Sequence, residues 1–125
     1  MHILLADDDT FFQKFYQSQL QEHGHTVDVA VDGKDALKQL AGKKPDLLIL
    51  DIIMPHKDGF EVLVELKKMP SLAHLPILIF STLGQEPDVE RALKLGASGY
   101  VNKSFFDFDT LLAKIDEVVK SSRRT

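Results

Sequence analysis

Cysteine is absent from this chain of 125 residues, so disulfide bonds, thiolate catalysis and zinc–thiolate sites are excluded. Long hydrophobic runs are absent as well, and no apolar segment approaches the length needed to span a membrane. The segment 1–7 lacks a basic stretch and reaches an acidic residue almost at once, unlike a signal peptide. We therefore expect a cytoplasmic protein, or a cytoplasmic part of a longer one, with no membrane association.

An excess of positive charge is also lacking, since the net charge is −4, and this argues against direct nucleic acid binding by this segment. The composition, with 44% hydrophobic and 27% charged residues, is that of an ordinary globular domain. The length suffices for one domain with a real hydrophobic core and is too short for two domains. We expect a single domain over residues 1–120, followed by a polar tail over 121–125 that frays or begins a linker.

Five short apolar segments alternate with five segments whose apolar residues recur at helical spacing. The predicted strands are Ile3–Ala6, Val27–Val31, Leu47–Leu50, Ile77–Phe80 and Gly99–Val101. The helical pattern is seen in Phe12/Phe15/Tyr16/Leu20, Ala36/Leu37/Leu40/Ala41, Phe60/Leu63/Val64, Val89/Ala92/Leu93 and Leu111/Leu112/Ile115/Val118/Val119. Strict alternation predicts an α/β fold, with a parallel sheet covered by helices on both faces.

The predicted strands differ in how continuously apolar they are. The first, third and fourth are apolar without a break, as expected of central strands that are covered on both faces. The second alternates, with Val27, Val29 and Val31 facing one way, and the fifth is short, with polar Asn102 beside it. These two are therefore the predicted edges, which favours the strand order 2-1-3-4-5 of a flavodoxin-like (βα)5 three-layer sandwich.

Turn and capping residues stand between these segments. Glycines occur where three helices should end, at Gly24, Gly42 and Gly96. The expected N-cap residues are Asp9 or Thr10, Asp32, and Asp107 or Asp109. These signals support the predicted alternation of strands and helices.

Four of the five predicted strands are followed by side chains that can carry chemistry. They are Asp7-Asp8-Asp9, Asp51, Ser81-Thr82 and Asn102-Lys103, after the first, third, fourth and fifth strands. Taken singly, these residues have ordinary interpretations as helix caps, turn residues or a solvated lysine. The carboxyl ends of parallel strands, however, meet at one edge of the sheet, where folds of this class bind their ligands. The coincidence of four such ends favours a functional site.

The acidic residues of this edge are the informative ones. Two carboxylates about 4 Å apart repel by roughly 4 kcal/mol at an effective dielectric of about 20, so a raised pKa, a lysine or a cation must offset the repulsion. Ligand sets made only of oxygen, without histidine or cysteine, suit Mg²⁺ rather than zinc. The residues therefore predict an open magnesium site that can still accept a phosphate oxygen.

At these residues the sequence resembles the receiver domains of bacterial two-component response regulators. The resemblance spans essentially the whole chain and rests on an ordered set of motifs. They are ILLADDD at 3–9, LDIIMP at 50–55 with Asp58-Gly59, Leu75-Pro76 leading into Ser81, and GASGYV at 96–101 leading into Lys103. Each motif is moderately specific, and the ordered set with its spacing is very specific.

The resemblance implies that Asp51 is the phosphoacceptor, receiving its phosphoryl group from a histidine kinase or a histidine phosphotransfer domain. It implies a Mg²⁺ cofactor, for which Mn²⁺ can substitute. Asp8 and Asp51 would bind the ion directly, Asp7 would assist through water, and the backbone carbonyl of Ile53 would complete the protein ligands. Lys103 would neutralise part of the phosphate charge.

The resemblance also implies a switch. Ser81 would donate its hydroxyl to the phosphate, and Tyr100 would move inward in response. The switched surface would comprise the fourth helix, fifth strand and fifth helix, roughly residues 88–119. It would act on a downstream protein target or a fused output domain. The chain would catalyse only its own phosphoryl transfer and a slow self-dephosphorylation.

The sequence departs from the family pattern in two respects. Ser104 stands where a proline, joined by a cis bond, usually follows the lysine, so the bond after Lys103 is either a costly cis bond or a trans bond in a reshaped loop. Ile53 and Leu83 are apolar where polar side chains can position a hydrolytic water, and Thr82 narrows access further. We therefore expect slow self-dephosphorylation.

Three other interpretations were weighed against this one. A haloacid-dehalogenase-type enzyme is disfavoured because its threonine would come one residue early in Asp7-Asp8-Asp9-Thr10, and because the sequence leaves no room for a substrate-selecting cap domain. An FMN carrier is disfavoured because three acids occupy its phosphate loop. A degenerate receiver that serves as a constitutive protein-interaction module is kept open by Ser104.

Overall fold

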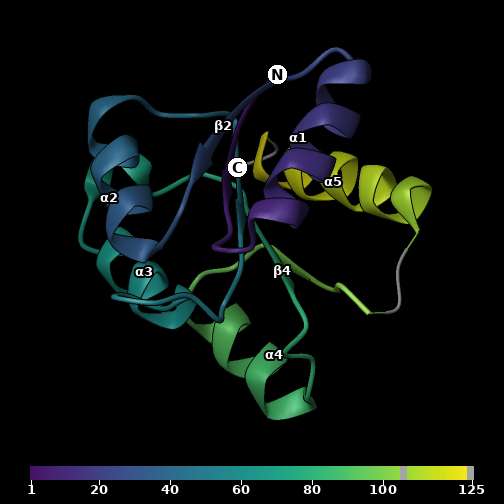
Figure 1. The fold of residues 1–125 in the computed structure, drawn as a ribbon. Helices are drawn as coiled ribbons and strands as arrows, with labels where there is room; N and C mark the ends of the chain where they lie inside the picture. The colour runs from purple at the N-terminus through teal and green to yellow at the C-terminus, as the bar shows by residue number, and fades with distance from the viewer. Residues whose placement is uncertain (105–106, 124–125) are drawn as a thin grey trace.

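Five parallel strands form one sheet in the predicted order β2-β1-β3-β4-β5 (Figure 1). The computed structural model describes residues 1–104 and 107–123. The strands are β1 (His2–Ala6), β2 (Thr26–Ala30), β3 (Leu47–Leu50), β4 (Ile77–Ser81) and β5 (Gly99–Asn102). The helices are α1 (Thr10–Glu22), α2 (Gly33–Gly42), α3 (Gly59–Leu66), α4 (Glu86–Lys94) and α5 (Phe108–Arg123), with a short 3₁₀ helix η1 at Pro70–Leu72. The fold is the predicted flavodoxin-like sandwich.

The three central strands are buried along their whole length, apart from the half-buried first residue of β1. Because successive side chains of a strand point to opposite faces, β1, β3 and β4 supply residues to both hydrophobic cores. Ile3, Leu47 and Phe80 belong to the core on one face. Leu4 and Leu48 belong to the core on the other. Continuous apolar runs therefore identified the central strands, as expected for a parallel sheet.

The helices divide between the two faces of the sheet. In Figure 1, α1 and α5 lie on one side, and α2, α3 and α4 lie on the other. The first core accordingly contains Tyr16 and Leu20 of α1 with residues of α5. The second contains buried residues of α2, α3 and α4, such as Ala36, Leu63 and Ala92. No helix in the described part of the chain is both long and apolar enough to cross a membrane.

The predicted helix signals are present. Asp9 and Asp32 are the N-caps of α1 and α2, and their carboxylates accept hydrogen bonds from backbone amides of the first turn. The carboxylate of Asp107 accepts a bond of 2.7 Å from the Thr110 amide at the start of α5. Gly24 and Gly96 have positive φ of 89° and 109° just after α1 and α4, a conformation that suits glycine.

Some burial expectations were wrong. Strand β2 ends at Ala30, which is buried, whereas Val31 lies beyond the strand and is 54% exposed. Apolar side chains of three helical stripes also face solvent, namely Phe15, Val64 and Leu93. Regular spacing places a residue near the buried stripe but does not fix the stripe's width.

Helix α5 continues to Arg123, into the segment that was expected to be a polar tail, and residues 124–125 lie outside the described part.

Candidate functional site

Strand register brings the predicted site residues to one edge of the sheet. Ala6 pairs with Leu50, so Asp7 and Asp51 follow neighbouring strands at the same level, and the Asp51 amide donates to the Ala6 carbonyl at 3.0 Å. At the other side of the site, the Lys103 amide donates to the carbonyl of Ser81 at 2.9 Å. The backbone therefore carries acids and a lysine to the same end of the molecule.

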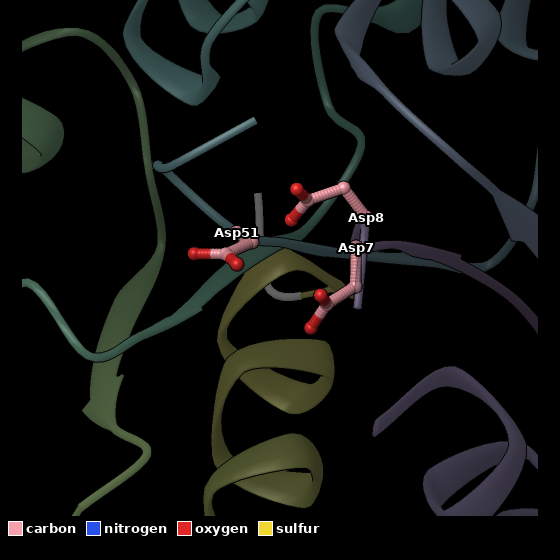
Figure 2. Close-up of side chains that lie close together, drawn as sticks. All are labelled: Asp7, Asp8 and Asp51. Carbon is pink, nitrogen blue, oxygen red and sulfur yellow. The ribbon is translucent and has the colours of Figure 1, made fainter. Parts of the chain in front are cut away.

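The carboxylates of Asp7, Asp8 and Asp51 converge at this edge. One oxygen from each lies within 4.8 Å of the others. Figure 2 shows the Asp7 and Asp8 carboxylates leaving the same segment in different directions, with the Asp51 carboxylate on the side that both face. Asp7 and Asp51 are buried, whereas Asp8 is exposed. Like charges at this separation repel by roughly 3 kcal/mol at an effective dielectric of about 20, so the cluster needs a compensating cation.

Lys103 supplies one such cation. Its ammonium donates to the Asp51 carboxylate at 3.1 Å and forms a second, shorter ion pair with Asp7. The Lys103 side chain is only 4% exposed. Burial raises the pKa of Asp7, and the hydrogen bond from Lys103 acts in the opposite direction. The lysine is thus part of the site, and its peptide bond to Ser104 is trans.

The β3–α3 loop holds Asp51 from the other side. The Ile53 amide points at the Asp51 carboxylate, with N and O 3.3 Å apart. Gly59 begins α3 so close to this segment that a Cβ there would lie 2.5 Å from the Asp51 carbonyl oxygen. Ile53 itself is 54% exposed in this loop. Glycine at 59 is therefore required for the close approach of α3 to the site.

Ser81 and Tyr100 lie beside the cluster and meet at the β4–α4 loop. The Ser81 side chain is fully buried, and its hydroxyl oxygen accepts a hydrogen bond of 3.2 Å from the Leu83 amide. The Tyr100 hydroxyl donates to the carbonyl of Leu83. Burial raises the pKa of Tyr100 to about 12, so the ring stays neutral at physiological pH. One loop residue thus links the two predicted switch side chains, while Thr82 is exposed.

The donor set fits a hard divalent cation. Within residues 1–104 and 107–123, these three aspartates are the only acidic or histidine group of three or more placed to share a metal ion. All of their ligand atoms are carboxylate oxygens, which Mg²⁺ prefers. The exposure of Asp8 leaves the cluster open to solvent on one side. An ion bound there would keep water or phosphate ligands.

Phe12 also lies beside the site, with its ring centroid 4.6 Å from the Lys103 ammonium nitrogen, and was not among the predicted site residues. In the sequence, Phe12 is one of the apolar residues that recur at helical spacing in α1, and this pattern predicts only that its side chain packs on the sheet. Contact with Lys103 depends on the path of the lysine side chain across the sheet edge, and spacing does not reveal that path.

Comparison with protein families gives a match over most of the chain. The sequence profile of the response regulator receiver domain matches residues 3–116. This chain belongs to the response regulator receiver domain family. It is therefore a receiver domain of the two-component signalling type, a signalling module rather than a classical enzyme.

Individual relatives agree with the family assignment. The chemotaxis protein CheY of Halobacterium salinarum is 36% identical over 103 residues, which are 82% of this chain and 84% of that protein. The probable transcriptional regulator ycf29 of Porphyra purpurea is 37% identical over 119 residues, which are 94% of this chain and 56% of that protein. The chain thus spans little more than half the length of the second relative.

Solved structures match the receiver fold closely. The receiver domain of the Francisella response regulator 1452 superimposes with a TM-score of 0.87 at 30% identity, covering 97% of this chain and 98% of that one. Receiver domains bind Mg²⁺ at an acidic pocket, and Asp7, Asp8 and Asp51 form an acidic cluster that could hold a metal ion here.

Proposed function

We propose that Asp51 accepts a phosphoryl group from a phosphohistidine of a histidine kinase or histidine phosphotransfer domain. The observation that carries this proposal is the convergence of Asp7, Asp8 and Asp51 with the buried Lys103 ammonium at one sheet edge. An Asp51 oxygen attacks phosphorus, the phosphorus–oxygen bond forms, and the phosphorus–nitrogen bond to the imidazole breaks. Such a reaction needs in-line placement and charge neutralisation more than covalent assistance.

The cation proposed for this site is Mg²⁺, with Mn²⁺ as a substitute. Asp8 and Asp51 would hold it directly, with Asp7 assisting and the backbone carbonyl of Ile53 completing the protein ligands. When bound, the ion supplies positive charge opposite the phosphoryl oxygens. Lys103 adds a further positive charge beside Asp51, and its burial makes that charge more effective than it would be in water.

The proposed switch involves the β4–α4 loop. In the unphosphorylated protein, the Ser81 hydroxyl oxygen accepts a hydrogen bond from the Leu83 amide. On phosphorylation, this bond breaks and the Ser81 hydroxyl donates to a phosphate oxygen instead. The new bond is charge-assisted and therefore stronger than the one that it replaces. Because Tyr100 also binds Leu83, the loop and the ring rearrange together. The surface formed by α4, β5 and α5, roughly residues 88–119, would then be altered for a downstream protein or a fused output domain. We place this activity in the cytoplasm, without membrane or nucleic acid contacts by this segment.

The test is incubation with acetyl phosphate, with and without Mg²⁺, followed by intact mass measurement of the wild type and Asp51→Asn. We expect a gain of one phosphoryl group that requires Mg²⁺ and Asp51. Beryllofluoride should shift amide resonances from residue 51 to residue 100 in the wild type alone. If neither reagent acts on the wild type, the chain is a constitutive interaction module instead.

A further inference from the structure

The Lys103 ammonium lies against aromatic rings as well as carboxylates. Its nitrogen is 4.6 Å from the ring centroid of Phe12 and 5.7 Å from that of Phe80. Both distances fall within the range at which a cation is attracted to the face of an aromatic ring. Tyr16 completes the group, since it stacks on Phe12 at 5.6 Å and meets Phe80 edge-on at 5.0 Å. We call Phe12, Tyr16 and Phe80 the aromatic seat.

The elements that carry the seat explain its geometry. Phe12 and Tyr16 are four residues apart on α1, so they lie on one face of that helix. Phe80 points from β4 into the core that α1 and α5 cover. Burial raises the pKa of Tyr16 to about 12, so the seat carries no charge of its own at physiological pH. The rings therefore attract the Lys103 ammonium electrostatically, although none of them carries a negative charge with which the lysine could form an ion pair.

The lysine needs such a seat because of the distance that it covers. Lys103 follows β5, yet its ammonium pairs with Asp51 after β3 and Asp7 after β1, across neighbouring strands that lie about 4.8 Å apart. A flexible four-carbon side chain that is held in one conformation loses the entropy of its other rotamers. Contacts along its path must offset that loss, or the ammonium would occupy several positions.

The backbone after Lys103 does not provide the restraint. Residue 104 is serine, so no proline ring fixes the backbone there. The side-chain amide oxygen of Asn102 accepts a hydrogen bond of 2.8 Å from the Ser104 amide, but this turn is exposed. The lysine side chain, in contrast, is only 4% exposed among the rings and carboxylates. Cation–π attraction is strongest for a desolvated cation, so the burial of the Lys103 ammonium strengthens its attraction to the aromatic seat.

We propose that Phe12 is a positioning residue, which holds the Lys103 ammonium between Asp7 and Asp51 and thereby sets the rate of phosphoryl transfer to Asp51. This inference rests on the proposed phosphoacceptor function, and it adds a residue that controls the rate of that function in this chain. Phe12 acts through Lys103 and does not itself touch the phosphoryl group. An aliphatic residue of similar volume would fill the same space but would not attract the ammonium.

The experiment compares Phe12→Leu, Phe12→Tyr and, as a matched control on the same helix, Phe11→Leu, whose side chain is 73% exposed. Two quantities are measured: the rate of Mg²⁺-dependent phosphorylation by acetyl phosphate, and the NMR shifts of the Lys103 ε-methylene group in the unphosphorylated protein. We expect Phe12→Leu to slow phosphorylation about tenfold and to reduce the ring-current shift of the Lys103 ε-methylene group to the part that Phe80 causes. Phe12→Tyr should restore both, and Phe11→Leu should change neither.

The readouts separate this proposal from the proposed function. If the wild type is phosphorylated on Asp51 while Phe12→Leu keeps the wild-type rate and Lys103 shifts, the seat proposal is wrong and the phosphoacceptor function stands. If the wild type is not phosphorylated at all, the proposed function fails, and the Lys103 shifts still test the seat. Nuclear Overhauser contacts between the Lys103 ε protons and the Phe12 ring are expected in the wild type, and their absence would overturn the proposal without any variant.

Discussion

The Asp7 carboxylate is buried close to two other acids, and the Lys103 ammonium is the group that makes this burial tolerable. Burial raises the pKa of Asp7, while its bond with Lys103 opposes the rise. Removing one partner of a buried ion pair is far more costly than removing an exposed one, because the remaining charge loses its compensation. Lys103 therefore contributes to the stability of the metal-free protein as well as to the proposed chemistry.

Lys103→Met should lower the unfolding free energy of the metal-free protein by roughly 3 kcal/mol at neutral pH. The deficit should shrink on acidification, because protonation of Asp7, whose pKa is raised by burial, removes an uncompensated charge. Chemical denaturation at several pH values measures it. Lys57→Met is the control, since Lys57 pairs with a half-exposed Glu65 and should cost less than about 1 kcal/mol. Equal losses in the two variants would contradict the buried role of Lys103.

The phosphorylated form should hydrolyse slowly, since the exposed side chain of Ile53 and the half-buried Leu83 offer no hydrogen bond to an attacking water. We expect a phosphoform that persists for minutes rather than seconds in magnesium buffer. Ile53→Asn and Leu83→Gln should each accelerate its decay at least about tenfold, as measured by loss of the phosphoryl mass. Val64→Asn, at another exposed apolar position, should leave the decay unchanged. Rapid decay of the wild type would disprove this account.

At the scale of secondary-structure elements, the N-terminus of α2 is attached to the loop between β3 and α3. The Gly33 amide donates to the Lys57 carbonyl at 3.1 Å, and the Asp32 carboxylate meets the His56 ring at 2.7 Å. His56 has a positive φ of 67°, which is uncommon for a residue other than glycine. This attachment fixes the loop that carries Ile53 past the site.

Gly33→Ala should disrupt the attachment. Its Cβ would lie 2.1 Å from the Lys57 carbonyl oxygen, a backbone atom that cannot move alone, so we expect a loss of about 2–3 kcal/mol in unfolding free energy. Gly42→Ala is the matched control, because nothing lies within 4 Å of the added Cβ. That change should stabilise α2 by up to about 1 kcal/mol. Urea denaturation distinguishes the two, and similar effects at both positions would refute the steric explanation.

The N-cap of α5 should contribute a pH-dependent part of the stability. Hydrogen bonds from Thr110 lower the pKa of Asp107 below its usual value of 3.8. A lowered folded-state pKa contributes stability that is present above the unfolded-state pKa and is lost as the pH falls through the folded-state pKa. Thermal midpoints of the wild type should exceed those of Asp107→Asn at neutral pH, with a gap that closes in acid. A constant gap across this range would show that charge is not involved.

At the scale of the whole molecule, the sheet order and the gathering of reactive residues at one edge could be predicted from the sequence. Uninterrupted apolar runs identify strands that are covered on both faces, and strand ends locate Asp51 and Lys103 without knowledge of packing. The exposure of Val31 and Phe15 could not be predicted, because periodicity does not reveal where a helix or strand edge meets solvent. The contact between Phe12 and Lys103 depends on the path of the lysine side chain at the sheet edge, which no local pattern encodes.

The central claim is that the phosphoryl group is attached to Asp51. The most direct measurement is borohydride reduction of protein phosphorylated by acetyl phosphate in the presence of Mg²⁺, followed by peptide mass spectrometry. Reduction converts an aspartyl phosphate to homoserine and leaves free aspartate unchanged. We expect homoserine in place of Asp51 and intact aspartate at Asp7 and Asp8. Homoserine at another aspartate, or none anywhere in phosphorylated protein, would contradict it.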